Sequence, residues 1–107
     1  MPRTLSILLL ISLLCAACSD STDKYLDRAR GAILVANYQS ATHELKQALL
    51  IDSNLAEARW LLGEIYLELG EIRNAEKELR LAGKLGWAAD DVRPALAICG
   101  MAQGNFE

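Results

Sequence analysis

The sequence predicts an all-α fold that follows a removable N-terminal segment. Apolar residues recur at the three- and four-residue spacing of one helix face. The clearest run is Leu55, Ala58, Leu62, Ile65 and Leu69. No stretch alternates at period two for long enough to form a strand. The sequence also matches itself at one constant offset, which is the mark of an internal repeat. The clearest pairs are Ala41 with Ala75, Leu45 with Leu79, and Ala48 with Ala82.

The composition is that of one small globular domain. The chain has 107 residues, of which 52% are hydrophobic and 23% are charged, and only 2 are proline. This balance excludes an intrinsically disordered chain. The net charge of −3 gives no electrostatic reason to expect nucleic-acid binding.

Residues 1–17 have the pattern of a secretory signal. Arg3 and the terminal amine form a short positive region, and an apolar run follows at residues 5–14. This run is too short to span a bilayer comfortably. The small residues Ala16 and Ala17 come next, and a polar stretch follows them.

Cys15 and Cys18 stand three apart at the junction of the apolar and polar stretches. A redox pair would need a βαβ context, and a zinc site would need more ligands than Cys99 and His43 supply. The junction resembles the lipobox of bacterial lipoproteins, which implies that Cys18 is lipidated and anchors the mature chain to a membrane. Ser19 resembles the second residue of lipoproteins sent to the outer membrane. Ordinary signal cleavage and a redox or metal pair are the alternatives.

Five helices are expected in the remainder of the chain. Asn54 and Glu57 resemble a capping box at the start of the third helix. Gly70 and Gly86 are placed to end the third and fourth helices. The expected ranges are 22–35, 39–51, 55–69, 72–85 and 90–103.

The stretch at residues 56–87 contains Leu62 and Gly63, then Tyr66, and later Ala75 and Leu79. This pattern resembles the tetratricopeptide repeat, a helix–turn–helix unit whose period matches the offset between the matching pairs above. Arg59 replaces the usual tryptophan, and Trp87 replaces the usual junction proline. The resemblance implies a helical solenoid of about two and a half repeats. The expected signature positions are Ala41, Leu45, Ala48, Leu62, Gly63, Tyr66, Gly70, Ala75, Leu79 and Ala82.

Together, the signal and lipobox pattern and the repeat resemblance divide the chain into five segments. They are a signal peptide at 1–17, the lipidated cysteine and spacer at 18–21, repeat one at 22–55, repeat two at 56–89, and the first helix of an incomplete third repeat at 90–107. The last helix is apolar all round at residues 94–102, so we expect it to be covered on both sides. Either the chain is the start of a longer array, or it is a complete small protein whose last helix docks on a partner.

The whole chain resembles the start of the tetratricopeptide-repeat lipoproteins of PEP-CTERM/exosortase systems. The resemblance lies in the lipoprotein signal, the segment AEARWLLGEIYLELGEIRNAEKELRLAGKLG and the ending QGNFE. It implies a periplasmic scaffold that supports exopolysaccharide export and protein sorting. A type IV pilus or other envelope-assembly lipoprotein, and the N-terminal repeats of a longer envelope enzyme, are the alternatives.

Repeat arrays bind proteins or peptides along a concave face formed by the first helix of each unit. A mixed acidic and apolar groove suits an extended peptide or a partner helix. Alternatively, Trp60 and Ile98 pack only against neighbouring repeats. The candidate groove residues are Asp23, Leu26, Arg30, Glu57, Trp60, Glu64, Asp91, Ile98 and Met101.

No residue pattern predicts catalysis, a cofactor, a metal or a small-molecule substrate. His43 is expected to be solvated, and Cys99 to be a small buried apolar residue. Glu64 and Glu68 lie on one helix face, whereas a glycosidase needs two acids across a cleft. The expected function is a non-enzymatic scaffold that binds proteins and does not bind nucleic acid.

Overall fold

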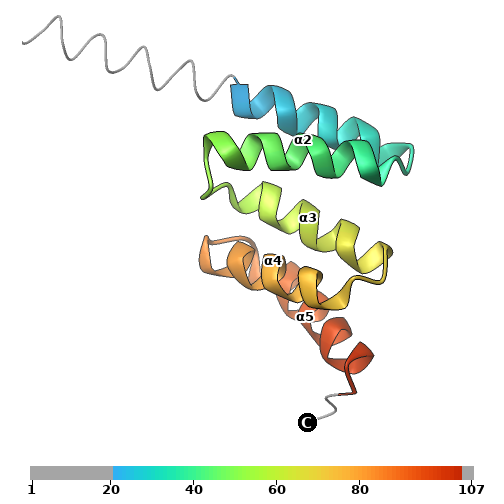
Figure 1. Ribbon diagram of the computed structural model, residues 1–107. Coiled ribbons are helices and arrows are strands. Elements are labelled where there is room, and N and C mark those ends of the chain that lie inside the picture. The colour runs from blue at the N-terminus through green and yellow to red at the C-terminus, as the bar shows by residue number, and fades with distance from the viewer. Residues whose placement is uncertain (1–20, 105–107) are drawn as a thin grey trace, which may run out of the picture.

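The structure is a computed structural model that describes residues 21–104. The signal peptide expected at 1–17, Cys18 and residues 105–107 therefore lie outside the described residues. The predicted all-α fold is confirmed, because the described chain consists of helices and short turns (Figure 1). The helices are residues 21–34, α2 at Tyr38–Ile51, α3 at Ala56–Glu68, α4 at Ile72–Lys84 and α5 at Ala89–Ala102.

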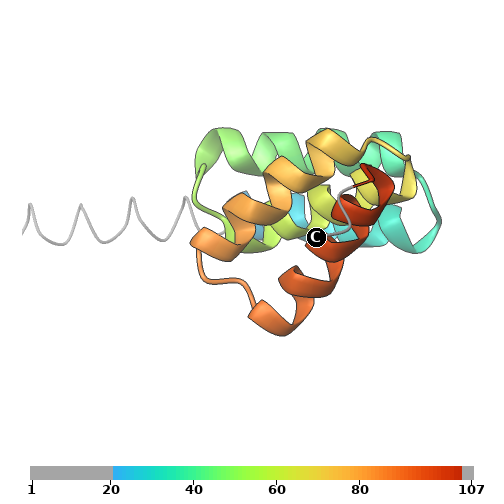
Figure 2. The same ribbon diagram turned by 90° about the horizontal axis from the view of Figure 1, so that it is seen from below.

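The helices stack in chain order as a ladder of antiparallel neighbours (Figure 1). Seen from below, α2 lies toward one side of the stack and α5 toward the other, with α3 and α4 between them (Figure 2). Contacts join α2 to α3, α3 to α4, α4 to α5, and α3 to α5. The start of the first helix lies at the limit of the described residues. Every other helix boundary lies within one residue of its expected position, which is the uncertainty inherent in assigning helix ends.

The turn that ends the first helix of each pair recurs at the same place in every repeat. After helix 21–34, the Asn37 N–H donates to the Ala32 carbonyl at 2.9 Å, and the Ala36 N–H donates to the Ile33 carbonyl at 2.9 Å. These two bonds form a Schellman motif, which needs a residue with positive φ. Glycine fills that position in the later repeats, whereas the first repeat uses alanine. The residues at this position are Ala36 with a φ of 56°, Gly70 with 74° and Gly104 with 77°. Gly86, in the turn after the second helix α4, also has a positive φ, at 95°.

The predicted capping box at the start of α3 is wrong. The N-cap residue is Leu55, and no side chain caps the helix. Asn54 lies one residue too early for this role, and its backbone N–H donates to Asp52 Oδ1 at 3.0 Å in the preceding turn. Glu57 instead accepts a hydrogen bond from Arg30 in the first helix.

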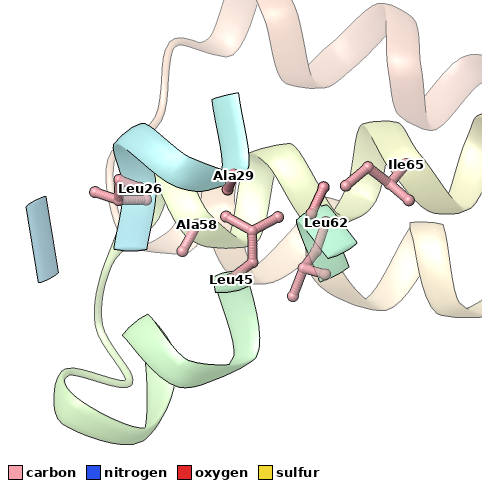
Figure 3. Packing of buried hydrophobic residues seen from close by; sticks show 7 residues of the cluster. Leu26, Ala29, Leu45, Ala58, Leu62 and Ile65 are labelled. Atoms are coloured by element: carbon pink, nitrogen blue, oxygen red, sulfur yellow. The ribbon is translucent and has the colours of Figure 1, made fainter. Parts of the chain in front are cut away.

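The core consists of two clusters that α3 connects. The first cluster joins helix 21–34 and α2 to α3, and the second joins α4 to α5. Tyr66 on α3 packs against both clusters. Figure 3 shows the first cluster, with Leu26, Ala29, Leu45, Ala58, Leu62 and Ile65. The second contains Ala75, Leu79, Ala95 and Cys99.

A glycine allows α3 and α4 to approach each other closely. A Cβ atom on Gly63 would lie 2.7 Å from both Cγ and Cδ2 of Leu79, closer than real side chains approach. Leu79 therefore occupies the space over the bare backbone of Gly63. The other apolar signature positions are also buried. They are Ala41, Leu45, Ala48, Leu62, Ala75 and Ala82.

Candidate protein-binding surface

The first helix of each pair turns one face away from the second helices. We call this surface the first-helix face and define it as the exposed side of helix 21–34, α3 and α5. On α3 it follows the helical spacing of Glu57, Trp60, Glu64 and Glu68. The three stripes are neighbours, because Arg30 bonds to Glu57 and because the carboxylates of Glu64 and Asp91 interact electrostatically.

Arg30 connects the first two stripes through a fork of charged hydrogen bonds. Its Nε donates to Glu57 Oε1 at 2.7 Å, and its Nη1 donates to Asp27 Oδ1 at 2.6 Å. The hydrogen bond to Glu57 raises the pKa of Arg30, with smaller contributions from the charges of Glu57 and Asp27. Because both hydrogen bonds are exposed, the fork contributes orientation more than stability.

Leu26 does not lie on the first-helix face, contrary to the sequence-based expectation. Its side chain is only 4% exposed and belongs to the first core cluster, near Ala29 and Ala58 (Figure 3). The equivalent position in the next repeat, Trp60, is also partly buried against a core cluster. This repeat position therefore packs against the neighbouring repeat, which is the alternative that the sequence left open for Trp60.

Trp60 stacks on Trp87, which lies in the turn between α4 and α5. The ring centroids are 5.9 Å apart and the planes differ by 15°. The Nε1 atom of Trp87 is buried, and it has no hydrogen-bond partner within the part of the chain that the structure describes. From the sequence, Trp87 stood out only because it replaces the usual proline. A large aromatic residue at a repeat junction was the feature that could have indicated this contact.

Three carboxylates gather where α3 meets α5. Burial raises the pKa of Glu64, and the negative charges of Glu68 and Asp91 raise it further. Among residues 21–104 no cation forms an ion pair with Glu64, Glu68 or Asp91, although other acids of the chain have such partners. The negative charge at this junction is therefore uncompensated.

The α5 part of the first-helix face also exposes large apolar side chains. Ile98 is 49% exposed and Met101 is 56% exposed. Asp91 is exposed in the first turn of α5, where a negative charge suits the helix dipole. Asp23, on the first helix, is also exposed. The structure thus exposes six of the nine candidates, leaves Glu57 and Trp60 half-buried, and places Leu26 in the core.

A buried ion pair between α3 and α4 was missed by the sequence reasoning. Arg59 Nη1 donates to Glu78 Oε2 at 3.0 Å, and Arg59 Nη2 donates to the Ser53 carbonyl at 3.2 Å. Glu78 is buried, and Arg59 is largely covered. One sequence feature could have indicated this ion pair. Glu44 and Glu78 match each other at the repeat offset, and both acids lie on the inner side of a second helix.

The described residues contain no group of side chains arranged as a metal site. No group of three histidine, cysteine or acidic residues within 21–104 could hold a metal ion. His43 is exposed on α2, and Cys99 is buried, with a thiol pKa raised mainly by that burial. No helix within the described range is long and apolar enough to cross a membrane.

Stacked antiparallel helix pairs that recur at a constant sequence period define a helical-repeat protein. The chain belongs to the tetratricopeptide repeat family, whose model matches residues 32–86, just over half of the sequence. A search of curated protein sequences finds no match. Repeats of this family generally bind protein partners and are typically non-catalytic, so the fold supports a scaffold for protein–protein interaction.

Proposed function

We propose that this protein is a non-enzymatic, lipid-anchored scaffold that holds protein partners in the bacterial envelope. The observation that carries the proposal is the first-helix face, where α5 exposes Ile98 and Met101 and where Glu64, Glu68 and Asp91 form no ion pair with any described residue. An exposed apolar patch with polar residues around it is typical of a site where another protein binds. The mechanism is passive: the stacked helix pairs hold this face in shape, and a partner binds to it.

The lipid anchor rests on the sequence around Cys18. An apolar run at 5–14, the small residues at 16–17 and then a cysteine are what export and lipidation require. The mature chain would remain on a membrane, with outer-membrane placement favoured by Ser19. The resemblance to the exosortase-system lipoproteins favours a role in exopolysaccharide export and protein sorting. A type IV pilus lipoprotein is the competing role.

Fractionation of cells that express variant chains tests the anchor. Cys18→Ser should move the protein from the membrane fraction to the soluble periplasmic fraction, because the acyl chains are lost. Cys99→Ser is the matched control and should stay in the membrane fraction, since Cys99 is a buried core residue. Membrane retention of the Cys18→Ser chain would contradict the anchor.

Photo-crosslinking tests the binding surface. A photoreactive residue at Glu68, which is exposed on the first-helix face, should form a discrete adduct with a partner protein in cells. The same residue at Lys77, exposed on α4, is the control and should not form that adduct. Equal amounts of the adduct from both positions would show that the first-helix face is not the binding site.

A deletion strain separates the two envelope roles. Loss of surface polysaccharide with motility intact supports the export role. Loss of pilus-dependent motility with surface polysaccharide intact supports the pilus role. The scaffold function itself is common to both and is tested by the crosslinking above.

A further inference from the structure

The charges of residues 21–104 are unevenly distributed over the stack. The exposed sides of helix 21–34, α3 and α5 carry seven carboxylates and four cations, a net charge of −3. The other charged side chains of the described range are six cations and five carboxylates, a net charge of +1. The seven carboxylates belong to Asp23, Asp27, Glu57, Glu64, Glu68, Asp90 and Asp91, and the four cations to Lys24, Arg28, Arg30 and Arg93.

The negative charge is concentrated toward the α5 end of the face. Arg30 bonds to both Glu57 and Asp27 and offsets one of their two negative charges. Glu64, Glu68 and Asp91 have no such partner among the described residues. Like charges that are held together without a cation between them are unfavourable for folding, so this end of the face gains from a cationic partner.

Exposed apolar side chains lie at the same end of the face. Ile98 is 49% exposed and Met101 is 56% exposed. Both are on α5, the helix that contributes Asp91 and that packs against the α3 stripe containing Glu64. A partner that covers this end must supply positive charge to the carboxylates and apolar side chains to Ile98 and Met101.

We propose that the first-helix face binds a cationic peptide segment of a partner protein, in which lysine or arginine residues meet Glu64, Glu68 and Asp91 while apolar residues cover Ile98 and Met101. This deepens the proposed scaffold function and rests on it. The charge attracts the segment and fixes its orientation, and the apolar contact retains it. An acidic segment would be repelled from the same surface.

Binding of three labelled peptides to the purified full chain, in a non-ionic detergent, tests the proposal. The peptides are four copies of Lys-Leu-Ser, of Glu-Leu-Ser and of Lys-Ser-Ser, measured by fluorescence anisotropy. The lysine–leucine peptide should bind at least tenfold more tightly than the other two. Its affinity should fall with added salt, because exposed charges are screened over about 8–10 Å at physiological ionic strength.

A matched pair of variants locates the effect on the face. Glu64→Gln with Asp91→Asn should weaken the lysine–leucine peptide about fivefold or more. Asp52→Asn with Glu71→Gln changes the net charge of the chain equally but lies in turns away from the face, and should change binding less than twofold. Equal weakening by both pairs would show that only overall charge matters and would overturn the proposal.

Two other results would also overturn it. One is binding of the glutamate–leucine peptide as tight as that of the lysine–leucine peptide, or no binding of the latter. The other is an in-cell adduct at position 68 whose crosslinked segment contains no lysine or arginine. That second result would leave the scaffold function intact, whereas absence of any adduct at position 68 would count against the scaffold function itself.

Discussion

Ala36 is the one described residue other than glycine that adopts positive φ, at 56°. The equivalent turns of the second and third repeats use Gly70 and Gly104. A Cβ atom in the left-handed region costs about 1–2 kcal/mol, and the extra freedom of glycine in the unfolded chain offsets part of this. We expect Ala36→Gly to stabilise the protein by about 0.5–1 kcal/mol in urea denaturation.

The control for Ala36→Gly is the same substitution within a helix. Ala97 is exposed inside α5, so Ala97→Gly should destabilise the protein by about 1 kcal/mol. Opposite signs for the two variants would assign the gain to the turn. A loss of stability in Ala36→Gly would contradict the repeat-turn argument.

Gly63 is required because Leu79 leaves no space for a methyl group. A Cβ atom there would lie 2.7 Å from two carbon atoms of Leu79. We expect Gly63→Ala to destabilise the protein by about 1–3 kcal/mol, because overpacking outweighs the gain in helix propensity. Thermal unfolding monitored by circular dichroism would measure the change.

Gly31 provides the comparison for Gly63. It lies in helix 21–34, and no atom is within 4 Å of the place where its Cβ would stand. Gly31→Ala should therefore stabilise the protein by up to about 1 kcal/mol. If both alanine variants were more stable than wild type, close packing of Leu79 would not be the reason that position 63 is glycine.

Glu64 has a raised pKa, so its ionised form is less favourable in the folded state than in the unfolded chain. Its contribution to the unfolding free energy therefore falls as the pH rises between the usual glutamate pKa and the raised value. We expect Glu64→Gln to be more stable than wild type at pH 7 by roughly a few tenths of a kcal/mol. This difference should vanish in acid, where Glu64 is protonated. Melting temperatures across pH would show it.

Glu76 should give the opposite sign. Hydrogen bonds from Gln103 and Arg80 lower the pKa of Glu76, so its contribution to stability is present above the usual glutamate pKa and is lost as the pH falls through the lowered value. Glu76→Gln should therefore be slightly less stable than wild type at pH 7. A loss of stability in Glu64→Gln at that pH would contradict the repulsion argument.

At the scale of elements, one ion pair fixes how α3 and α4 meet. Arg59 and Glu78 pair at 3.0 Å with both side chains largely covered. Removing one partner leaves a desolvated charge, which costs about 3–5 kcal/mol when burial is complete and less here. We expect Glu78→Ala to lower the unfolding free energy by about 2–3 kcal/mol.

An exposed pair on the same helix is the comparison. Arg80 and Glu76 lie 2.7 Å apart near the surface of α4. Arg80→Ala should change the unfolding free energy by less than about 0.5 kcal/mol. Similar losses for Glu78→Ala and Arg80→Ala in urea denaturation would show that burial does not set the importance of the Arg59 pair.

The elements were predictable to within one residue because local chemistry determines them. Apolar spacing locates each helix, and Gly70 and Gly86 end two of them with positive φ. The capping box at Asn54 failed because its placement depends on a single residue of register. The contacts between elements were less predictable. Whether Leu26 faces solvent or the next repeat depends on helix packing, which the repeat period alone does not specify.

The candidate surface was predictable as a stripe but not in its electrostatics. Helical spacing placed Glu57, Glu64 and Asp91 on first helices. Only the fold shows that Arg30 neutralises Glu57 and that Glu64 and Asp91 remain unpaired. The Trp60–Trp87 stack joins residues that are far apart along the chain, and no local pattern predicts such a contact.

At the scale of the whole molecule, the described stack should unfold as one unit. Its two core clusters share α3, and Tyr66 contacts both. Leu62 lies at the centre of α3 and is 2% exposed. Leu62→Asp loses the burial of an apolar side chain, about 2–3 kcal/mol, and places a charge in the core, which costs several kcal/mol more. This total approaches the stability of a small domain, so both clusters should unfold together.

Two signals measure this unfolding transition. Far-ultraviolet circular dichroism follows the helices of the whole stack, and the near-ultraviolet signal follows the Trp60–Trp87 stack. In wild type both signals should change at the same temperature, and in Leu62→Asp both should be lost already at room temperature. Leu50→Asp is the matched control, because Leu50 is 79% exposed on α2 and the substitution should cost less than about 0.5 kcal/mol. A Leu62→Asp chain that kept the tryptophan signal would show that α4 and α5 fold independently of the first cluster.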